Sequence, residues 1–98
     1  MSAYVLTPLA KADIFRIWCD IAEDSEDAAE RVEQAIYDAC VFIAESPSCG
    51  HCRPDLTAHS LLFWTLTRYP NYALVYRPDT TPLQIVAVMH GREMFGAS

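Results

Sequence analysis

The segment with the most reactive side chains is Cys49-Gly50-His51-Cys52. Two cysteines separated by two residues can support thiol exchange when the first thiol lies at a helix N-terminus, because that position lowers its pKa. Here the two cysteines follow an apolar helical pattern and Pro47, and an irregular stretch comes next. This position disfavours thiol exchange, and redox activity of Cys49 and Cys52 stays an open alternative.

Zinc binding is the other chemistry that this segment could support. Cys49, Cys52 and either His51 or His59 are capable ligands. Structural zinc sites usually contain two complete pairs of ligands, and the sequence offers one pair of cysteines. We therefore expect no metal and no other cofactor, and we expect all four cysteines to be free thiols in a reducing cytosol.

A second group of polar side chains lies near the end of the chain. His90 and Arg92 follow the last apolar stretch and could act as a base and an anion clamp, together with Arg53 from the loop after the cysteines. Histidine and arginine are also ordinary surface residues, so they make a site only if the fold brings them to one surface. The sequence alone therefore assigns no catalytic residue.

Charge is distributed unevenly along the chain. Residues 13–45 hold ten acidic and two basic side chains, whereas residues 46–98 hold three acidic and four basic ones. A phosphate backbone would be repelled by the first part and only weakly attracted to the second, which argues against direct DNA binding. No apolar stretch approaches the roughly 20 residues that span a bilayer, so we expect a cytoplasmic protein without a membrane segment.

The elements that must position these side chains follow from periodicity. Apolar residues repeat with helical spacing in two long segments, and the period changes to that of strands after residue 60. Thr7 with Pro8 favours the start of the first helix, and Asp24 or Ser25 favours the start of the second. The predicted order is a strand at 3–6, helices at 8–24 and 26–46, and strands at 61–67, 72–76 and 83–89.

These elements predict a single α+β domain over residues 1–98, with the order β-α-α-β-β-β. The short connection between the helices favours an antiparallel helical hairpin, packed on a small antiparallel sheet. The last two strands are nearly continuous apolar runs, so we expect both faces of the sheet to be covered, one by the hairpin and the other partly by a partner. Trp18 and Trp64 lie on periodic apolar faces and belong to the core or to a partner surface.

The order of these segments resembles the ParE branch of the ParE/RelE toxins over nearly the whole chain. The resemblance rests on several short segments taken together in order. They are Tyr4-Val5-Leu6-Thr7-Pro8 with the helical segment 12–18, Glu45-Ser46-Pro47 with the loop segment 50–56, the strand segment 71–77, and the closing Val88-Met89-His90-Gly91.

The resemblance implies a helical hairpin on a small sheet, and growth arrest relieved by a ParD-like antitoxin that folds on binding in a hetero-oligomer. The usual target of the branch is DNA gyrase, so we expect a gyrase inhibitor of the plasmid-stabilisation type rather than an enzyme. Candidate residues for binding the target or the antitoxin are Trp18, Trp64, Tyr76, Arg77, His90 and Arg92.

Two alternatives stay open. One is a ribosome-dependent mRNA endonuclease of the RelE type, for which His90, Arg92 and Arg53 are the candidate catalytic residues. The chain departs from many relatives by carrying Ala87 in place of an arginine in the last strand, and it has no basic cluster after that strand. The other alternative is a non-toxic module that binds a partner.

Overall fold

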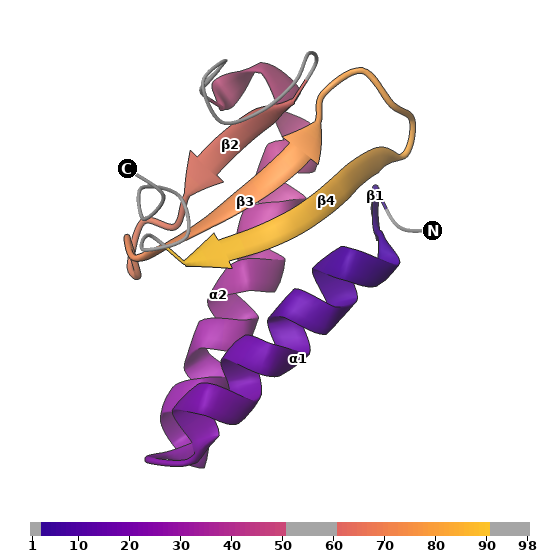
Figure 1. Ribbon diagram of the computed structural model, residues 1–98. Helices are drawn as coiled ribbons and strands as arrows, with labels where there is room; N and C mark the ends of the chain where they lie inside the picture. The colour runs from indigo at the N-terminus through magenta and orange to yellow at the C-terminus, as the bar shows by residue number, and fades with distance from the viewer. Residues whose placement is uncertain (1–2, 51–60, 91–98) are drawn as a thin grey trace, which may run out of the picture.

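The protein is described by a computed structural model, which covers residues 3–50 and 61–90. The predicted fold class is confirmed, and the predicted bounds agree with the observed ones within two residues (Figure 1). The elements in order are β1 (Tyr4–Leu6), α1 (Pro8–Ala22), α2 (Glu26–Glu45), the 3-10 turn η1 (Pro47–Cys49), β2 (Leu62–Thr65), β3 (Tyr72–Arg77) and β4 (Leu83–His90).

Both long helices begin at a side-chain cap. The Thr7 hydroxyl accepts a hydrogen bond from the backbone N–H of Ala10 at 3.1 Å, and Pro8 occupies the first turn of α1. The Ser25 hydroxyl accepts from the N–H of Ala28 at 3.2 Å, so Ser25 rather than Asp24 caps α2. The capping signals in the sequence therefore located both helix starts.

The four strands form one sheet in the order β1-β4-β3-β2. The pairs β2–β3 and β3–β4 are antiparallel, as predicted, but β1 lies parallel to β4, so the sheet is mixed rather than purely antiparallel. The chain leaves β1 for the hairpin and returns beside it only with the last strand. A connection of that length allows parallel pairing, which a tight turn does not.

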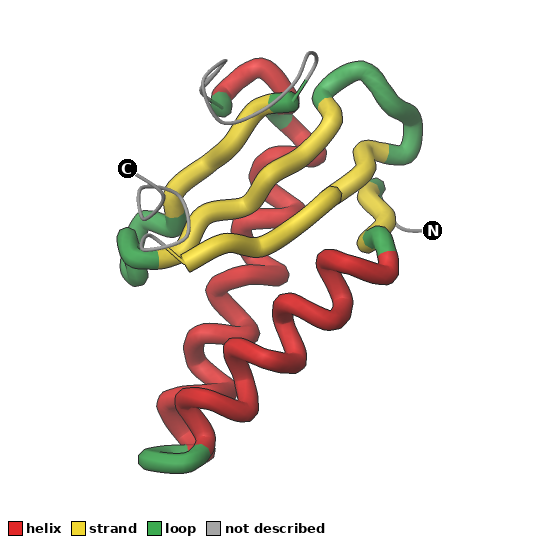
Figure 2. The backbone as a smooth tube through the Cα atoms, viewed as in Figure 1, coloured by secondary structure: helices red, strands yellow, loops and turns green. Residues whose placement is uncertain are grey.

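The two helices cover one face of the sheet (Figure 2). Ile14, Ile36, Tyr76 and Ile85 belong to a single apolar core, and each is at most 4% exposed. Ala73 and Val75 alternate with the core residues of β3 and are also buried, at 1% and 6% exposure. Both faces of β3 are therefore withdrawn from solvent, as the continuous apolar run indicated.

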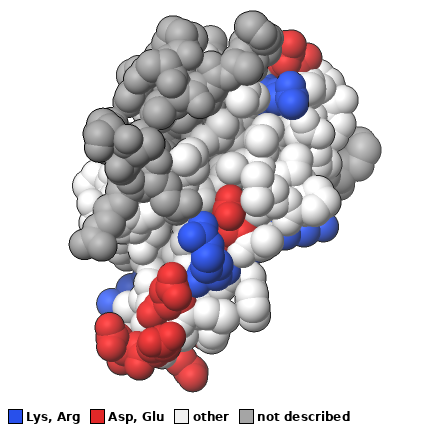
Figure 3. Space-filling view, in the orientation of Figure 1, with Lys and Arg blue, Asp and Glu red and all other residues white. Residues whose placement is uncertain are grey.

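The hairpin extends beyond the sheet at the turn that joins its helices (Figure 1). Acidic side chains gather at this end of the molecule (Figure 3). They include Glu26 and Asp27 in the first turn of α2, where carboxylates complement the positive end of the helix dipole. No helix among the described residues has the length and apolar character needed to cross a membrane.

Side chains from α1 and its N-cap residue complete the hydrogen bonding of β4 where β1 ends. The Thr7 hydroxyl donates to the carbonyl oxygen of Val86 at 2.7 Å, and a carboxylate oxygen of Asp13 accepts from the N–H of Val88 at 3.1 Å. The pairing of β3 with β4 is irregular at the same point. These two contacts fix α1 to the edge of the sheet.

Candidate partner-binding site

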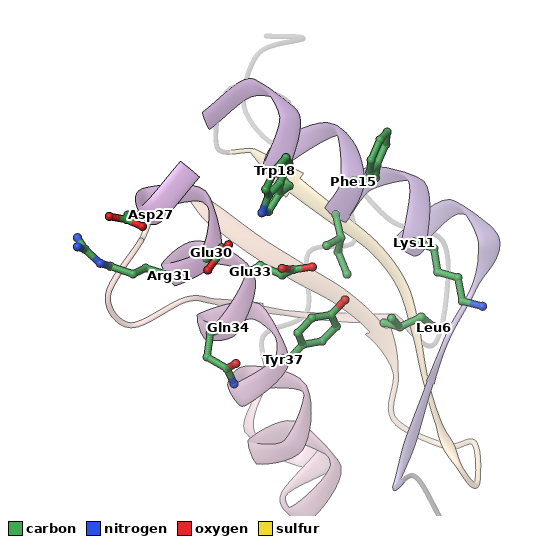
Figure 4. A pocket seen from close by; sticks show the side chains of 11 residues that line it. Leu6, Lys11, Phe15, Trp18, Asp27, Glu30, Arg31, Glu33, Gln34 and Tyr37 are labelled. Atoms are coloured by element: carbon green, nitrogen blue, oxygen red, sulfur yellow. The ribbon is translucent and has the colours of Figure 1, made fainter. Parts of the chain in front are cut away.

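A hollow in the described surface is a groove between α1 and α2, which we call the hairpin groove. It encloses about 1030 Å³ (Figure 4). Its apolar and aromatic lining residues are Leu6, Ile14, Phe15, Trp18 and Tyr37. Because Ile14 and Trp18 are four positions apart, they lie on the same side of α1, and Tyr37 faces them from α2.

The aromatic residues of the hairpin groove differ in their exposure to solvent. Phe15 is 69% exposed, the highest value among the exposed large apolar residues described in the structure. Trp18 and Tyr37 are half-buried, and both point into the space between the helices (Figure 4). An exposed aromatic ring on a groove that two further aromatic side chains line is typical of a protein-binding surface.

Charged side chains form the rim of the hairpin groove. The charged lining residues are three carboxylates, those of Asp27, Glu30 and Glu33, and two cations, Lys11 and Arg31. Burial raises the pKa of Tyr37, and the neighbouring Glu33 carboxylate raises it further, so Tyr37 stays a neutral phenol. The rim carries a net negative charge and favours a partner segment with basic side chains.

The residues proposed from the sequence do not converge on this groove. Trp18 lines it, whereas Trp64 lies on β2 and packs against Phe42 of α2, with ring centroids 5.3 Å apart. Arg77 and His90 lie at opposite ends of the sheet, because Arg77 pairs with Gln84 and His90 with Tyr72. Arg92 and Arg53 lie outside the described residues.

Tyr76 is buried in the core rather than placed at the surface, with no exposed area. Its hydroxyl donates to the carbonyl oxygen of Pro47 at 2.7 Å and accepts from the N–H of Gly50 at 2.9 Å. Burial, followed by the nearby Cys49, raises the pKa of Tyr76 to about 12. The side chain holds the turn after α2 and offers no direct contact to a partner.

Gly50 is required by the close approach of that turn. A Cβ atom at this position would collide with the Tyr76 hydroxyl and would lie 2.9 Å from the carbonyl oxygen of Phe63. Cys49 is half-buried and is a free thiol. Cys52, His51 and His59, the other residues of the possible thiol or zinc site, lie outside the described residues.

His90 packs edge-on against Tyr72, with ring centroids 5.1 Å apart. Burial and then the charge of Asp20 raise the pKa of Tyr72. Of the three residues considered for RNA cleavage, His90 alone falls in the described part of the chain. Within residues 3–50 and 61–90 no three histidine, cysteine or acidic side chains are arranged to hold a metal ion.

Sequence reasoning missed Phe15 and Tyr37 as site residues. A signal for Phe15 was present, because it falls outside the apolar stripe of its helix, which contains Ile14, Ile17 and Ile21. A large aromatic residue on the polar side of an amphipathic helix indicates a surface contact. Tyr37 gave no such signal, since it directly follows the buried Ile36.

Comparisons with known proteins found a matching family model and solved structures of similar fold. A family model described as "ParE toxin of type II toxin-antitoxin system, parDE" matches residues 4–95. A solved structure described as "Chromosomal ParDE TA system from P. aeruginosa" is similar in fold, with a TM-score of 0.74 at 20% sequence identity. That alignment covers 92% of this chain and 96% of the other. A search of curated proteins found no match.

Proposed function

Since the chain belongs to the ParE toxin family of type II toxin–antitoxin systems, we propose that it arrests growth by inhibiting DNA gyrase in the cytoplasm until a ParD-like antitoxin binds it. The hairpin groove is the docking surface for that antitoxin. The observation that carries this assignment is the exposed ring of Phe15 on a groove that Trp18 and Tyr37 also line and that has an acidic rim.

The chemistry of the hairpin groove specifies the antitoxin segment. Apolar side chains of an amphipathic segment would cover Phe15 and Trp18, and lysine or arginine side chains would approach Glu30 and Glu33. Such a segment can be disordered when free and fold on binding, because the groove supplies the apolar surface that it lacks alone. The ordering cost keeps the complex reversible when the antitoxin is degraded.

Gyrase is favoured over ribosome-bound mRNA as the target because of charge. The chain carries a formal net charge of −6, and the carboxylates at the end of the hairpin would repel an RNA backbone. Cleavage of RNA would also require groups that stabilise negative charge at the scissile phosphate. A protein target does not impose that requirement.

The direct test is a supercoiling assay with purified gyrase and purified toxin. We expect the toxin to abolish supercoiling, and we expect prior addition of the cognate antitoxin to restore it. Unchanged supercoiling together with transcripts cut at the ribosome would replace gyrase inhibition by mRNA cleavage. In that case His90→Ala should remove the cleavage.

Expression of the chain alone in a bacterial host tests toxicity separately from the target. Growth should stop on induction and resume when the antitoxin is expressed as well. Continued growth with folded protein present would leave only the non-toxic binding module. Immunoblotting of the cells recognises degraded protein. Circular dichroism of the protein purified from them recognises unfolded protein.

A further inference from the structure

A second groove lies on the other side of α2, between that helix and β2 with the turn that follows β2. We call it the α2–β2 groove. One part encloses about 280 Å³ and is lined by Ala35, Asp38, Phe42, Trp64, Leu66 and Arg68, among others. It continues into a hollow of about 410 Å³ that Arg31, Gln34 and Tyr69 also line. Arg31 and Gln34 line both this groove and the hairpin groove, so they lie between the two.

The α2–β2 groove offers an aromatic contact for an apolar side chain. The rings of Phe42 and Trp64 are tilted by 38° with centroids 5.3 Å apart, and Phe42 is 45% exposed. Leu66 lies at the base and is 2% exposed. An aromatic or aliphatic side chain placed here would cover Phe42 and contact a well-packed floor.

The charge of the α2–β2 groove is opposite to that of the hairpin groove. Arg31 and Arg68 are exposed and form no ion pair with any residue in the described part of the chain. Asp38 is the carboxylate that lines this groove, and one of its oxygens already accepts a hydrogen bond from the side-chain amide of Gln34 at 2.9 Å. Two guanidinium groups against one carboxylate give this groove a net positive charge, which favours carboxylates on the occupant.

We propose that the α2–β2 groove is a second docking surface, and that it takes an acidic protein segment carrying one aromatic or aliphatic side chain. The apolar side chain covers Phe42 and Trp64, and the carboxylates pair with Arg31 and Arg68. This segment belongs to a partner other than the chain that fills the hairpin groove, because the two grooves select opposite charges. The proposal stands whether or not gyrase is the target.

The two tryptophans of the chain allow each groove to be observed alone. The variant Trp18→Phe leaves Trp64 as the reporter of the α2–β2 groove, and Trp64→Phe leaves Trp18 as the reporter of the hairpin groove. The probe is the blocked peptide acetyl-Glu-Asp-Leu-Phe-Asp-Glu-amide, titrated at low ionic strength. A peptide with lysine in place of each acidic residue is the control.

We expect the acidic peptide to produce a saturable change in Trp64 emission and none in Trp18 emission. The response should weaken as salt is added, and the lysine peptide should produce no change at Trp64. Arg68→Glu should weaken binding by about tenfold or more. Arg77→Glu, at an exposed position on β3, should leave it unchanged.

Several results would overturn the proposal. They are a response at Trp18 alone, no saturable response at Trp64, or an affinity that Arg68→Glu leaves intact. A change in Trp64 emission when the cognate antitoxin alone is added would also overturn it, because the antitoxin would then occupy this groove. If Trp18→Phe does not fold, 5-fluorotryptophan in the unaltered chain reports both positions through separate ¹⁹F signals.

Discussion

The two grooves beside α2 have similar aromatic residues and differ in charge. Each combines an exposed phenylalanine with a half-buried tryptophan, Phe15 with Trp18 in the hairpin groove and Phe42 with Trp64 in the α2–β2 groove. Three carboxylates and two cations line the first groove, and two arginines and one carboxylate line the second; Arg31 lines both and is counted in each. Aromatic burial can supply affinity in both grooves, while charge selects which segment enters each.

The largest expected effect is a loss of folding stability at alkaline pH, which should affect both grooves together. Cys40 lies fully buried on the core side of α2, and burial raises its pKa from 9.0 to about 12. The thiol therefore keeps its proton in the folded protein at a pH where the unfolded chain has lost it. Stability from this group is complete below pH 9 and is lost as the pH rises toward 12, a fall of up to about 4 kcal/mol.

Urea unfolding at a series of pH values, followed in the two single-tryptophan variants, measures this fall. The midpoints at Trp18 and Trp64 should decrease together, because both grooves depend on the same core. Cys40→Ala should reduce the pH dependence while lowering stability at neutral pH. The part that remains belongs to groups such as the buried Tyr76 phenol, whose pKa is also raised to about 12. If only one tryptophan responded to alkaline pH, the grooves would not share one cooperative unit.

The next effect should separate the grooves. Phe15→Glu removes the exposed ring and places a charge where the apolar side chains of the antitoxin dock, so antitoxin affinity should fall by about a hundredfold, or about 3 kcal/mol. Phe42→Glu makes the same change in the α2–β2 groove and should leave antitoxin affinity unaltered. Isothermal titration calorimetry with the cognate antitoxin measures both.

Leu9→Glu is the matched control on α1, because Leu9 is 57% exposed and does not line the hairpin groove. Its antitoxin affinity should equal that of the unaltered chain. Equal losses in the Phe15 and Phe42 variants would contradict the separation of the two grooves. The antitoxin would then cover both sides of α2.

A smaller effect concerns the end of α2 nearest the sheet. Tyr76→Phe removes the hydroxyl that forms hydrogen bonds with the backbone of Pro47 and Gly50. The free energy of unfolding should therefore fall by about 2 kcal/mol. Tyr37→Phe, in the hairpin groove, should cost clearly less because that ring is half-buried. Thermal unfolding by circular dichroism compares the two, and equal losses would mean that the Tyr76 hydrogen bonds add nothing.

The smallest effects test how α1, the outer wall of the hairpin groove, is held. Asp13→Ala removes the acceptor for the N–H of Val88 and should cost about 1 kcal/mol. Arg16→Gln removes an ion pair with the same carboxylate, at 3.2 Å, in which the Arg16 side chain is half exposed, and should cost about 0.3 kcal/mol. Chemical denaturation resolves this order, and a larger loss in the Arg16 variant would reverse the assignment.

Much of the fold was predictable because its signals are local. Helix starts were marked by Thr7 and Ser25, whose hydroxyls bond to N–H groups three residues away. Strand segments were marked by apolar runs and by the residues that interrupt them. For the candidate site, sequence reasoning found Trp18 but scattered the other candidates over surfaces that the fold keeps apart.

The sequence by itself determined the elements, their order and the acidic character of the hairpin, because caps, periodicity and composition involve neighbouring residues. Tertiary structure decided the parallel pairing of β1 with β4, the burial of Tyr76 and the placement of Trp18 and Trp64 on opposite sides of α2. These outcomes depend on contacts between distant residues, such as Thr7 with Val86 and Asp13 with Val88. Local periodicity specifies which face of an element is apolar, but packing decides what that face meets.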